Sequence, residues 1–306
     1  MKVILIHNPS SGNGERHSGD DLAAMIREAG HAVVYVSARE KDWNEALEGD
    51  ADIVAVAGGD GIVGKVAKRT IGLKRPIAVL PLGTANNIAR TLGLLDEPLK
   101  RWVAGWDAAR QLKVDVGVAL GPWGTSCFIE GAGIGVFTEI MSRLDDRGNI
   151  DLAHTIDATE KIATARELLA AEVAQYPARR LDMFLDDEDI SGEYILLEAM
   201  NIQTIGPNLN LAPDADPCDG LLDIVSVSKD EREKLMAHLR ASLDGEFQRP
   251  ELTRRRGKHL RIVWRGFPVR IDDEVWPGKS PAPLMPEPIE ITPGPASVVF
   301  LSPAKY

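Results

Sequence analysis

The sequence predicts an α/β domain built on a parallel sheet, followed by a mostly antiparallel β domain. In the first third of the chain, short apolar runs alternate with segments whose aliphatic residues have helical spacing. Past about Asp107 the apolar runs are short and are separated by glycine, proline and aspartate. A length of 306 residues is enough for two domains of ordinary size, each with its own core. We therefore expect domains at residues 1–120 and 121–306, with a C-terminal tail able to pack back on the first.

The first domain is expected to be a βα repeat. Apolar, β-branched runs predict strands at residues 2–7, 31–36, 52–57 and 76–80. Helices are expected at residues 18–29, 43–47, 62–69 and 85–92. Ser18 is a candidate N-cap and Gly30 a candidate C′ residue of the first helix. Because such repetition builds a parallel sheet covered by helices, ligands are expected at the carboxyl ends of the strands.

The second domain is expected to be mostly strand, with two helical interruptions. Helical spacing without glycine or proline predicts a helix at 155–174, and a polar start predicts another at 230–243. The segment 277–295 contains seven prolines and is expected to be an extended loop. Strands are expected at residues 111–120, 125–131, 180–186, 194–201, 222–228, 259–264, 268–271 and 297–301.

Composition narrows the classes of function. The net charge of −11 argues against a general nucleic-acid binder, because such proteins are usually basic. The two cysteines, Cys127 and Cys218, are too few for a disulfide framework and indicate a reducing compartment. No apolar run approaches the roughly 18 residues that a membrane span needs. The default expectation is a cytoplasmic protein without a transmembrane segment.

The most informative stretch is a glycine-rich turn, Ala57-Gly58-Gly59-Asp60-Gly61, between an expected strand and an expected helix. The first N–H groups of a helix are unpaired, and its dipole favours an anion. Glycine lets the backbone approach a phosphate closely, because no Cβ stands in the way. The turn therefore predicts a nucleotide site, although a purely structural turn is the alternative.

Two further loops leave the same expected edge of the sheet. One is Asn8-Pro-Ser-Ser-Gly12, and the other is Pro81-Leu-Gly-Thr84 with Asn86 and Asn87 behind it. Thr84 could cap a helix or bond a phosphate oxygen, and ordinary capping is the alternative reading. No Gly-Lys-Ser/Thr follows the glycines, so the turn is not a P-loop, and the spacing differs from that of a dinucleotide fold.

Taken in order, these motifs resemble the diacylglycerol kinase catalytic-domain family, which includes bacterial lipid kinases and sphingosine kinases. The resemblance implies an N-terminal α/β domain like that of phosphofructokinases and NAD kinases, joined to a C-terminal β-sandwich for the lipid substrate. It implies ATP-dependent phosphorylation of a lipid hydroxyl with Mg²⁺. The motifs are Asn8-Pro-x-Ser-Gly12, Gly58-Gly-Asp-Gly61, Pro81-Leu-Gly-Thr-Ala-Asn86, Gly131-x-Gly-x-Gly135, Asp219-Gly-x-Leu-Asp223 and Asp272-x-Glu274.

The resemblance also implies roles for single residues. Asp272 would be the general base on the lipid hydroxyl, with Asp60 as the competing candidate. Asp216, Asp219 and the carbonyl of Leu221 match a structural magnesium site, for which an acidic surface turn is the alternative. Ser37 falls where the family usually has a nucleotide-contacting threonine. The residues expected to bind ATP are Asn8, Ser37, Gly58, Gly59, Asp60, Gly61, Ile62, Val63, Gly64, Thr84, Asn86 and Glu274.

Three motifs depart from the family pattern and leave an alternative open. Ile62-Val63-Gly64 replaces threonine, an aliphatic residue and asparagine, and Asn87 replaces an aspartate. Asp273 replaces a glycine, at a position expected to need the backbone freedom of glycine. The alternative is a member that binds nucleotide or lipid without efficient phosphoryl transfer. An NAD kinase is disfavoured by the loop after the fourth strand and by the later motifs.

The expected partner is a lipid at the membrane surface, with peripheral association and a conceivable homodimer, and no nucleic acid. The basic stretch Arg254-Arg-Arg-Gly-Lys-His259 stands out against the acidic background. It could contact anionic lipid headgroups, or its charges could discourage pairing at a strand edge.

Overall fold

The computed structural model describes residues 1–12, 17–146, 158–243, 249–277 and 286–304. The chain divides into two units, one made of Met1–Val114 with Ala296–Tyr306 and the other of Asp115–Pro295. The division falls within strand β5 (Arg110–Gly121), slightly before the expected boundary at residue 120. The last residues of the chain belong to the first unit.

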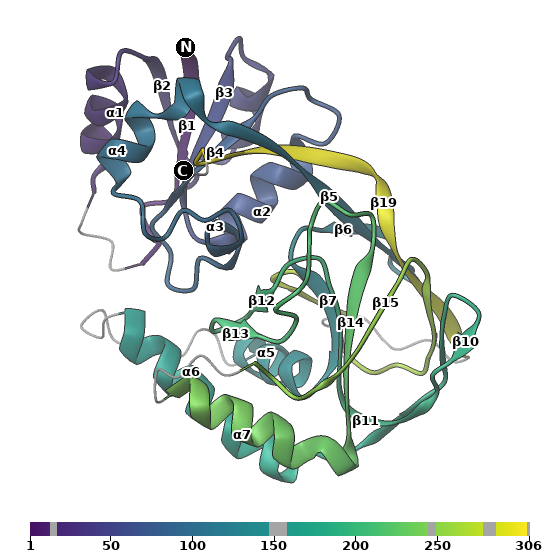
Figure 1. The fold of residues 1–306 in the computed structure, drawn as a ribbon. Helices are drawn as coiled ribbons and strands as arrows, with labels where there is room; N and C mark the ends of the chain where they lie inside the picture. The colour runs from purple at the N-terminus through teal and green to yellow at the C-terminus, as the bar shows by residue number, and fades with distance from the viewer. Residues whose placement is uncertain (13–16, 147–157, 244–248, 278–285, 305–306) are drawn as a thin grey trace. The chain divides into compact units, whose positions relative to one another are not determined.

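The first unit is built on a parallel sheet (Figure 1), as the sequence predicts. Its strands are β1 (Lys2–His7), β2 (Ala32–Ser37), β3 (Ile53–Gly58) and β4 (Ile77–Pro81), in the order β2-β1-β3-β4. Near the end of β19 (Glu287–Ser302), Phe300 pairs with Ile77 of β4 in parallel. The inner strands are apolar and almost entirely buried, whereas the edge strand β2 exposes Val34 and Tyr35.

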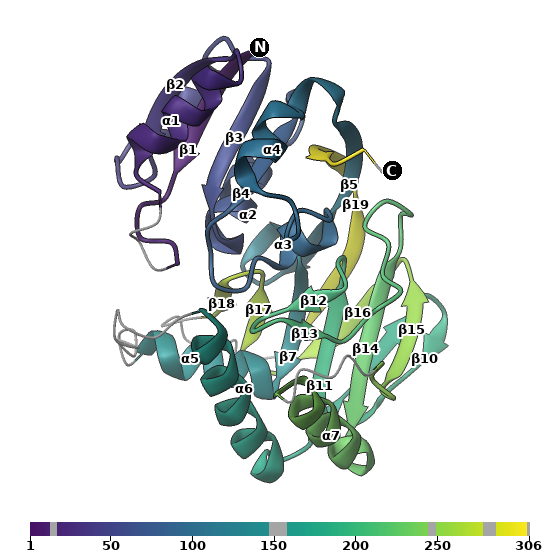
Figure 2. The ribbon, with the colours of Figure 1, turned by 60° about the vertical axis from the view of Figure 1, so that its left-hand side comes forward.

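Helices cover this sheet. Helix α1 packs with α4 (Figure 1), and α2 packs with α3 (Figure 2). The expected capping of α1 is confirmed, because Ser18 and Asp21 form a reciprocal capping box and Gly30 has φ +86°. The elements are α1 (Gly19–Glu28), the 3₁₀ turn η1 (Trp43–Glu48), α2 (Asp60–Arg69), α3 (Asn87–Thr91), α4 (Leu99–Ala104) and η2 (Trp106–Ala108).

The strand order creates a switch point. Strand β1 lies between β2 and β3, so the connections leaving β1 and β3 diverge at the carboxyl edge of the sheet. In open α/β sheets, ligands bind in the crevice outside this edge at such a point. The glycine-rich turn follows β3, and the loop beginning at Asn8 follows β1.

The second unit contains the antiparallel β-sandwich that the sequence and its family resemblance predict. One layer has the order β15-β14-β11-β7-β17-β18, with β8 also paired to β11, and neighbouring strands in it run antiparallel. These strands are β7 (Gly131–Gly135), β8 (Arg179–Leu181), β11 (Gly192–Met200), β14 (Leu222–Ser228), β15 (Thr253–Gly257), β17 (Val269–Ile271) and β18 (Glu274–Trp276). The other layer pairs β10-β9-β16-β19, with β5 beside β19 and β6 beside β5. Its further strands are β6 (Gly124–Phe128), β9 (Met183–Leu185), β10 (Glu188–Asp189) and β16 (Leu260–Trp264).

Two apolar cores hold this unit. One lies between the layers and includes Phe128, Leu197 and Trp264. The other lies on the far face of the layer that contains β11, under three helices, and includes Val173 and Leu239. Helices α6 and α7 lie side by side in this cover (Figure 1). The remaining elements are α5 (Val136–Asp146), α6 (Ala158–Gln175), η3 (Lys229–Glu231), α7 (Arg232–Leu243) and the small hairpin of β12 (Thr204–Ile205) and β13 (Leu209–Asn210).

The expectation of an extended loop over 277–295 is wrong where the structure describes it beyond residue 286. Strand β19 begins at Glu287, and its register pairs Pro288 with Val263 of β16. Proline is compatible with a strand where its nitrogen faces no ladder partner. The residues between the prolines, Ile289 and Ile291, are buried in the sandwich core. Residues 278–285 of that segment, and 155–157 of the expected helix at 155–174, lie outside the described residues.

In the part of the chain that the structure describes, no helix is both long enough and apolar enough to cross a membrane.

Candidate active site

Three loops meet at the carboxyl edge of the parallel sheet. Gly12 has φ +65°, and a Cβ added there would overlap the Leu82 carbonyl oxygen. A Cβ added at Gly83 would overlap the Cα of Gly59. The Gly59 N–H donates to the Ser11 hydroxyl at 3.4 Å. The loops after β1, β3 and β4 therefore touch one another, and glycine is required where their backbones come closest.

The glycine-rich turn leads directly into α2. Gly59 is the N-cap and provides no side chain to cap the helix. The N–H of Val63 donates to the Gly59 carbonyl at 3.2 Å, so the N–H groups of Asp60 to Ile62 precede the helical ladder. Ile62, Val63 and Gly64 are buried in α2. At the start of α2, a phosphate could therefore bind to backbone N–H groups but not to the side chains of residues 62–64.

Asp60 joins the glycine-rich turn to helix α3. Its carboxylate accepts hydrogen bonds from the N–H groups of Asn87 and Ile88, each at 2.9 Å. Burial raises the pKa of Asp60, and these backbone donors act in the opposite direction. Asp60 thus has a structural task, capping α3 from outside, in addition to its position at the turn.

The loop after β4 uses its two polar side chains differently. The side chain of Asn86 closes on Gly83, accepting from its N–H at 2.9 Å and donating to its carbonyl at 2.8 Å. Asn86 also has φ +54°. Thr84 is half-buried, and its hydroxyl has no hydrogen-bond partner among the described residues. Thr84 therefore presents the available hydroxyl of this loop, whereas Asn86 holds the loop in shape.

The end of β2 contributes a cation that the sequence patterns did not indicate. Ser37 is level with His7 in the register of β2 and β1. Its hydroxyl accepts from the N–H of Arg39 at 3.3 Å, and the exposed Arg39 guanidinium donates to the Ser10 hydroxyl at 2.9 Å. A guanidinium beside a phosphate-binding loop is suited to an anion. A single arginine after an expected strand carries no motif, so only the contact with Ser10 reveals it.

In the second unit, the β17–β18 hairpin turns at Asp272 and Asp273. The residue in the left-handed region is Asp272, with φ +51°. Asp273 has no positive φ, so the expectation that Asp273 occupies a position needing glycine's freedom is wrong. Glu274, the first residue of β18, is exposed.

The Asp272 carboxylate points into the connection between β6 and β7. It is buried, and it accepts hydrogen bonds from the N–H groups of Ile129 at 3.1 Å and Glu130 at 2.9 Å. The N–H of Asp272 donates to the Gly131 carbonyl at 2.9 Å. Asp272 thereby fastens the hairpin turn to the strand connection beside it.

The acidic loop before β14 holds the residues that the resemblance assigns to magnesium. Asp216 accepts from the N–H of Cys218 at 3.0 Å, and Asp219 accepts from the N–H of Leu221 at 2.9 Å. The second Asp219 oxygen is paired with the Arg256 guanidinium. Oxygen ligands suit Mg²⁺, but a guanidinium already neutralises the carboxylate expected to bind it. The residues present fit an arginine clamp better than a metal site.

Among the residues that the structure describes, no group of three or more His, Cys, Asp or Glu side chains could hold a metal ion.

The basic stretch is mostly strand. Arg254, Arg255 and Arg256 lie in β15, the edge strand of its layer. Arg254 pairs with Asp214 at 3.1 Å, and Arg255 lies 3.6 Å from a Glu188 oxygen. These contacts favour the reading as a charged strand edge and give no support to headgroup binding by these arginines.

The arginine clamp makes a prediction about metal removal. EDTA is expected to leave the melting temperature of the protein unchanged, because Arg256 already neutralises Asp219. Arg256→Gln is expected to lower the melting temperature by about 2–4 °C and to make it rise again with added MgCl₂. Arg261→Gln is the matched control, since Arg261 lies over the Phe184 ring, outside the acidic loop. A fall in the wild-type melting temperature on EDTA treatment would favour the magnesium assignment instead.

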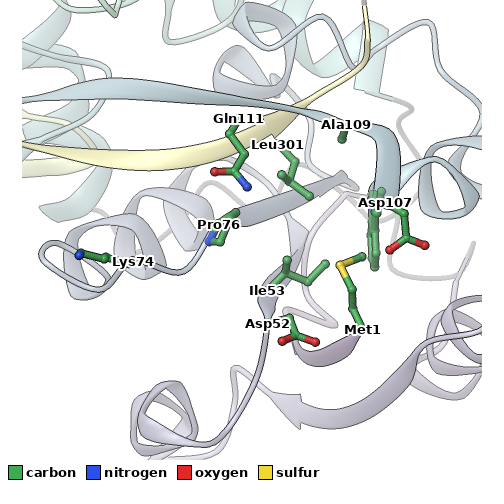
Figure 3. Close-up of a pocket in the computed structure, with 10 residues that line it drawn as sticks. Met1, Asp52, Ile53, Lys74, Pro76, Asp107, Ala109, Gln111 and Leu301 are labelled. Carbon is green, nitrogen blue, oxygen red and sulfur yellow. The ribbon is translucent and has the colours of Figure 1, made fainter.

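A separate cavity of about 370 Å³ opens at the opposite, amino-end edge of the parallel sheet (Figure 3). Asp52 and Pro76, which precede β3 and β4, line it together with Met1 and Asp107. None of the expected site residues lines this cavity. It is therefore distinct from the glycine-rich loops.

The structure thus places the expected residues in two groups. Asn8, Ser37, Gly58–Gly61, Thr84 and Asn86 belong to loops at one edge of the first unit's sheet, and Asp216, Asp219, Leu221, Asp272 and Glu274 belong to the second unit. The loops of the first group touch one another, whereas the acidic residues 216–221 and the turn at 272–274 are separate loops of the second unit.

Comparison with known proteins agrees with both units. Residues 2–119 match the model of the diacylglycerol kinase catalytic domain, and residues 150–300 match the YegS C-terminal NAD kinase beta sandwich-like domain. A Mycobacterium tuberculosis protein named diacylglycerol kinase is 28% identical over 323 residues, covering 99% of this chain and 95% of that protein. A Bacillus subtilis protein of the same name is 26% identical over 260 residues, covering 80% of each.

The fold is shared with solved structures as well. A crystal structure of a diacylglycerol kinase from Bacillus anthracis matches with a TM-score of 0.66 at 18% identity, covering 98% of this chain and 96% of that one. The two domain models follow each other in the order of the observed units and together span most of the chain. The chain therefore belongs to the diacylglycerol kinase catalytic-domain family of lipid kinases.

Proposed function

We propose that this protein transfers the γ-phosphoryl group of ATP to a hydroxyl of a diacylglycerol- or sphingoid-like lipid. The observation that carries the proposal is the contact of three glycine-containing loops at the switch point of the parallel sheet. Backbone donors at such a point suit a polyphosphate. The names of the relatives support a lipid as the acceptor.

The nucleotide would be held mainly by backbone and by a few side chains. We assign the phosphates to Gly58–Gly61 and Thr84, with Arg39 as an additional cation. Asn8, Ser37 and Asn86 shape the surrounding loops, and Glu274 is assigned to the nucleotide only through the resemblance. A divalent cation bound with ATP would neutralise part of the phosphate charge.

Two carboxylates are candidates for the general base. We favour Asp60, because burial raises its pKa and a raised pKa suits a carboxylate that accepts a proton. Both carboxylates accept backbone hydrogen bonds, Asp60 from α3 and Asp272 from the strand connection beside its turn, but Asp60 is partly exposed whereas Asp272 is buried. We therefore assign proton acceptance to Asp60 and the holding of the turn to Asp272.

The lipid hydroxyl oxygen forms a bond to the γ-phosphorus, and the bond from this phosphorus to the β–γ bridging oxygen breaks. ADP leaves with that oxygen, and Asp60 takes the proton of the hydroxyl. Charge neutralisation by backbone donors and Arg39, rather than covalent chemistry, would lower the barrier.

Transfer of labelled phosphate from ATP to a panel of lipid alcohols in mixed micelles tests the proposal. We expect labelled phospholipid with diacylglycerol or with a sphingoid base, and none without an acceptor. Absence of acceptor-dependent transfer to every lipid of the panel would refute the assignment.

The second candidate is a family member that binds nucleotide or lipid without efficient phosphoryl transfer. Two of the residues that differ from the family pattern are buried, which favours this candidate. The side chains of Ile62 and Asn87 are buried, so neither can offer a group to the nucleotide without rearrangement. Asp273 imposes no backbone strain, which weakens the third departure.

Restoring the family residues distinguishes the two candidates. The variants Ile62→Thr and Asn87→Asp, alone and combined, are expected to change the rate by less than about tenfold if the chain is an active kinase. Asp273→Gly is expected to have the smallest effect of the three. Transfer that appears only in the restored protein would establish the binding-only alternative.

Location at the cytoplasmic face of a membrane and self-association stay predictions. The exposed edge strand β2, with Val34 63% exposed, is the surface on which a second copy could pair.

A further inference from the structure

Three neighbouring strands of the second unit place a glutamate, a glycine and an arginine directly opposite one another. Glu198 of β11 pairs with Gly133 of β7, and Gly133 pairs with Arg270 of β17. Directly paired residues of antiparallel strands share a face of the sheet, and neighbouring strands lie about 4.8 Å apart. The side chains of Glu198 and Arg270 can therefore meet only across Gly133.

They do meet there. Arg270 Nη2 donates to Glu198 Oε2 at 2.6 Å. A Cβ added at Gly133 would overlap the Glu198 carboxylate. The middle glycine of Gly131-x-Gly-x-Gly135 is thus explained by the space that an ion pair requires, and this motif is a strand rather than a ligand loop.

The pair is almost completely removed from solvent. Glu198 is 0% exposed and Arg270 is 5% exposed. The second oxygen of Glu198, Oε1, has no hydrogen-bond partner among the described residues. Burial raises the pKa of Glu198, against the attraction of Arg270. A buried pair of this kind is a poor source of stability, because desolvation offsets much of the attraction.

Arg270 has a second set of contacts, and these reach the hairpin turn. Its Nη1 donates to the carbonyl of Asp272 at 2.9 Å and lies 3.5 Å from that of Gly131. The same two residues are joined by the bond from Asp272 N to Gly131 O, at 2.9 Å. The planar guanidinium therefore connects Glu198 to the turn and to the strand connection that receives the Asp272 carboxylate.

We propose that Glu198 and Arg270 are positioning residues that fix the β17–β18 turn, and with it the carboxylates of Asp272 and Glu274. Glu198 orients the guanidinium, and the guanidinium holds the Asp272 carbonyl. Glu274 follows the turn and takes its direction from it. The effect on catalysis rests on the proposed kinase function, whereas the effect on the turn does not.

A swap of the pair for apolar residues separates positioning from stability. The double variant Glu198→Leu/Arg270→Met keeps similar volume and removes both charges of the pair together, while the Asp272 carboxylate keeps its backbone donors at Ile129 and Glu130. We expect an equal or higher melting temperature, together with about tenfold faster amide exchange at residues 129–131. Because Glu274, which follows this turn, is assigned to the nucleotide, we also expect kcat/KM for lipid phosphorylation to fall about tenfold. The matched control is the same swap at Glu139 and Arg179, an ion pair of 2.5 Å elsewhere in this unit.

Each outcome decides one of the two claims. A double variant with wild-type exchange at 129–131 would overturn the positioning role, whether or not the protein is a kinase. A wild-type protein without acceptor-dependent transfer would refute the proposed function, and the exchange measurement would still decide the role of the pair. If the double variant does not fold, Arg270→Lys replaces it, because lysine keeps the charge but cannot bond Glu198 and Asp272 as a fork. Wild-type exchange and kcat/KM in Arg270→Lys would equally overturn the proposal.

Discussion

Replacing Asp60 with asparagine is expected to lower kcat for lipid phosphorylation by about 10²- to 10⁴-fold, the range that general-base catalysis contributes. The variant removes the proton acceptor but keeps the shape of the side chain. Because acid-base catalysis affects the chemical step, the KM for ATP is expected to change much less than kcat. Initial rates at varied ATP and lipid concentrations measure both quantities.

Because Asp60 also caps helix α3, the Asp60→Asn variant is expected to lose stability as well as kcat. An asparagine can still accept from one of the two N–H groups, at Asn87 or Ile88, and would leave the other short of a partner. A cost of about 1–3 kcal/mol in stability is therefore expected. Thermal unfolding must show that the variant is folded at the assay temperature. Asp42→Asn is the matched control, since Asp42 is exposed and makes no side-chain capping bond.

The pH dependence of the wild-type kcat tests the assignment of Asp60 as the base independently of any variant. The base must be ionised, and burial raises the pKa of Asp60, so the acidic limb of the kcat profile is expected above the usual range of an aspartate. Activity should fall as the pH drops through that value. If Asp272→Asn loses at least about tenfold more kcat than Asp60→Asn while remaining equally folded, Asp272 and not Asp60 would be the base.

Gly133→Ala is expected to destabilise the protein by about 3 kcal/mol or more. The new methyl group would overlap the Glu198 carboxylate in the middle of the layer, between β11 and β17. Relief requires either a shift of two strands or the breaking of a buried ion pair, and both are costly. Urea unfolding followed by circular dichroism measures the loss.

A double-mutant cycle ties this loss to its cause. In a Glu198→Ala background the space above Gly133 is free, so the added methyl group is expected to cost at least about 1.5 kcal/mol less. Gly105→Ala serves as the control, because a Cβ there would meet the nearest carbonyl oxygens at 3.5 Å, an ordinary contact. Additive effects in the cycle would show that the overlap with Glu198 is not the reason for the destabilisation.

The sequence predicts the first unit well because its signals are local. Apolar runs fix β1, β3 and β4, Ser18 and Gly30 bound α1, and a parallel sheet necessarily brings its carboxyl-end loops to one edge. Glycines at 12, 59 and 83 are visible in the sequence, but their mutual contact follows only from the strand order β2-β1-β3-β4.

The second unit could be predicted only in outline because its chemistry depends on register. The row of Glu198, Gly133 and Arg270 exists only in the pairing of three strands that are distant in the sequence. The direction of the Asp272 carboxylate depends on the residue in the turn that adopts positive φ. The partners of the arginines in β15 likewise follow from its pairing with β14. The prolines of β19 obscured a strand whose apolar residues alternate into the core.

The close approach of the loops in the first unit has a consequence for ligand affinity. The loops hold one another through three contacts, which together we call the brace. They are the contacts of Gly12 with Leu82, of Gly59 with Gly83 and of Asp60 with helix α3. Because these loops already hold one another, a ligand that binds at this edge would cost little conformational entropy of the chain. Loosening the brace, for example with Gly12→Ala, whose methyl group would overlap the Leu82 carbonyl oxygen, should therefore weaken binding through entropy.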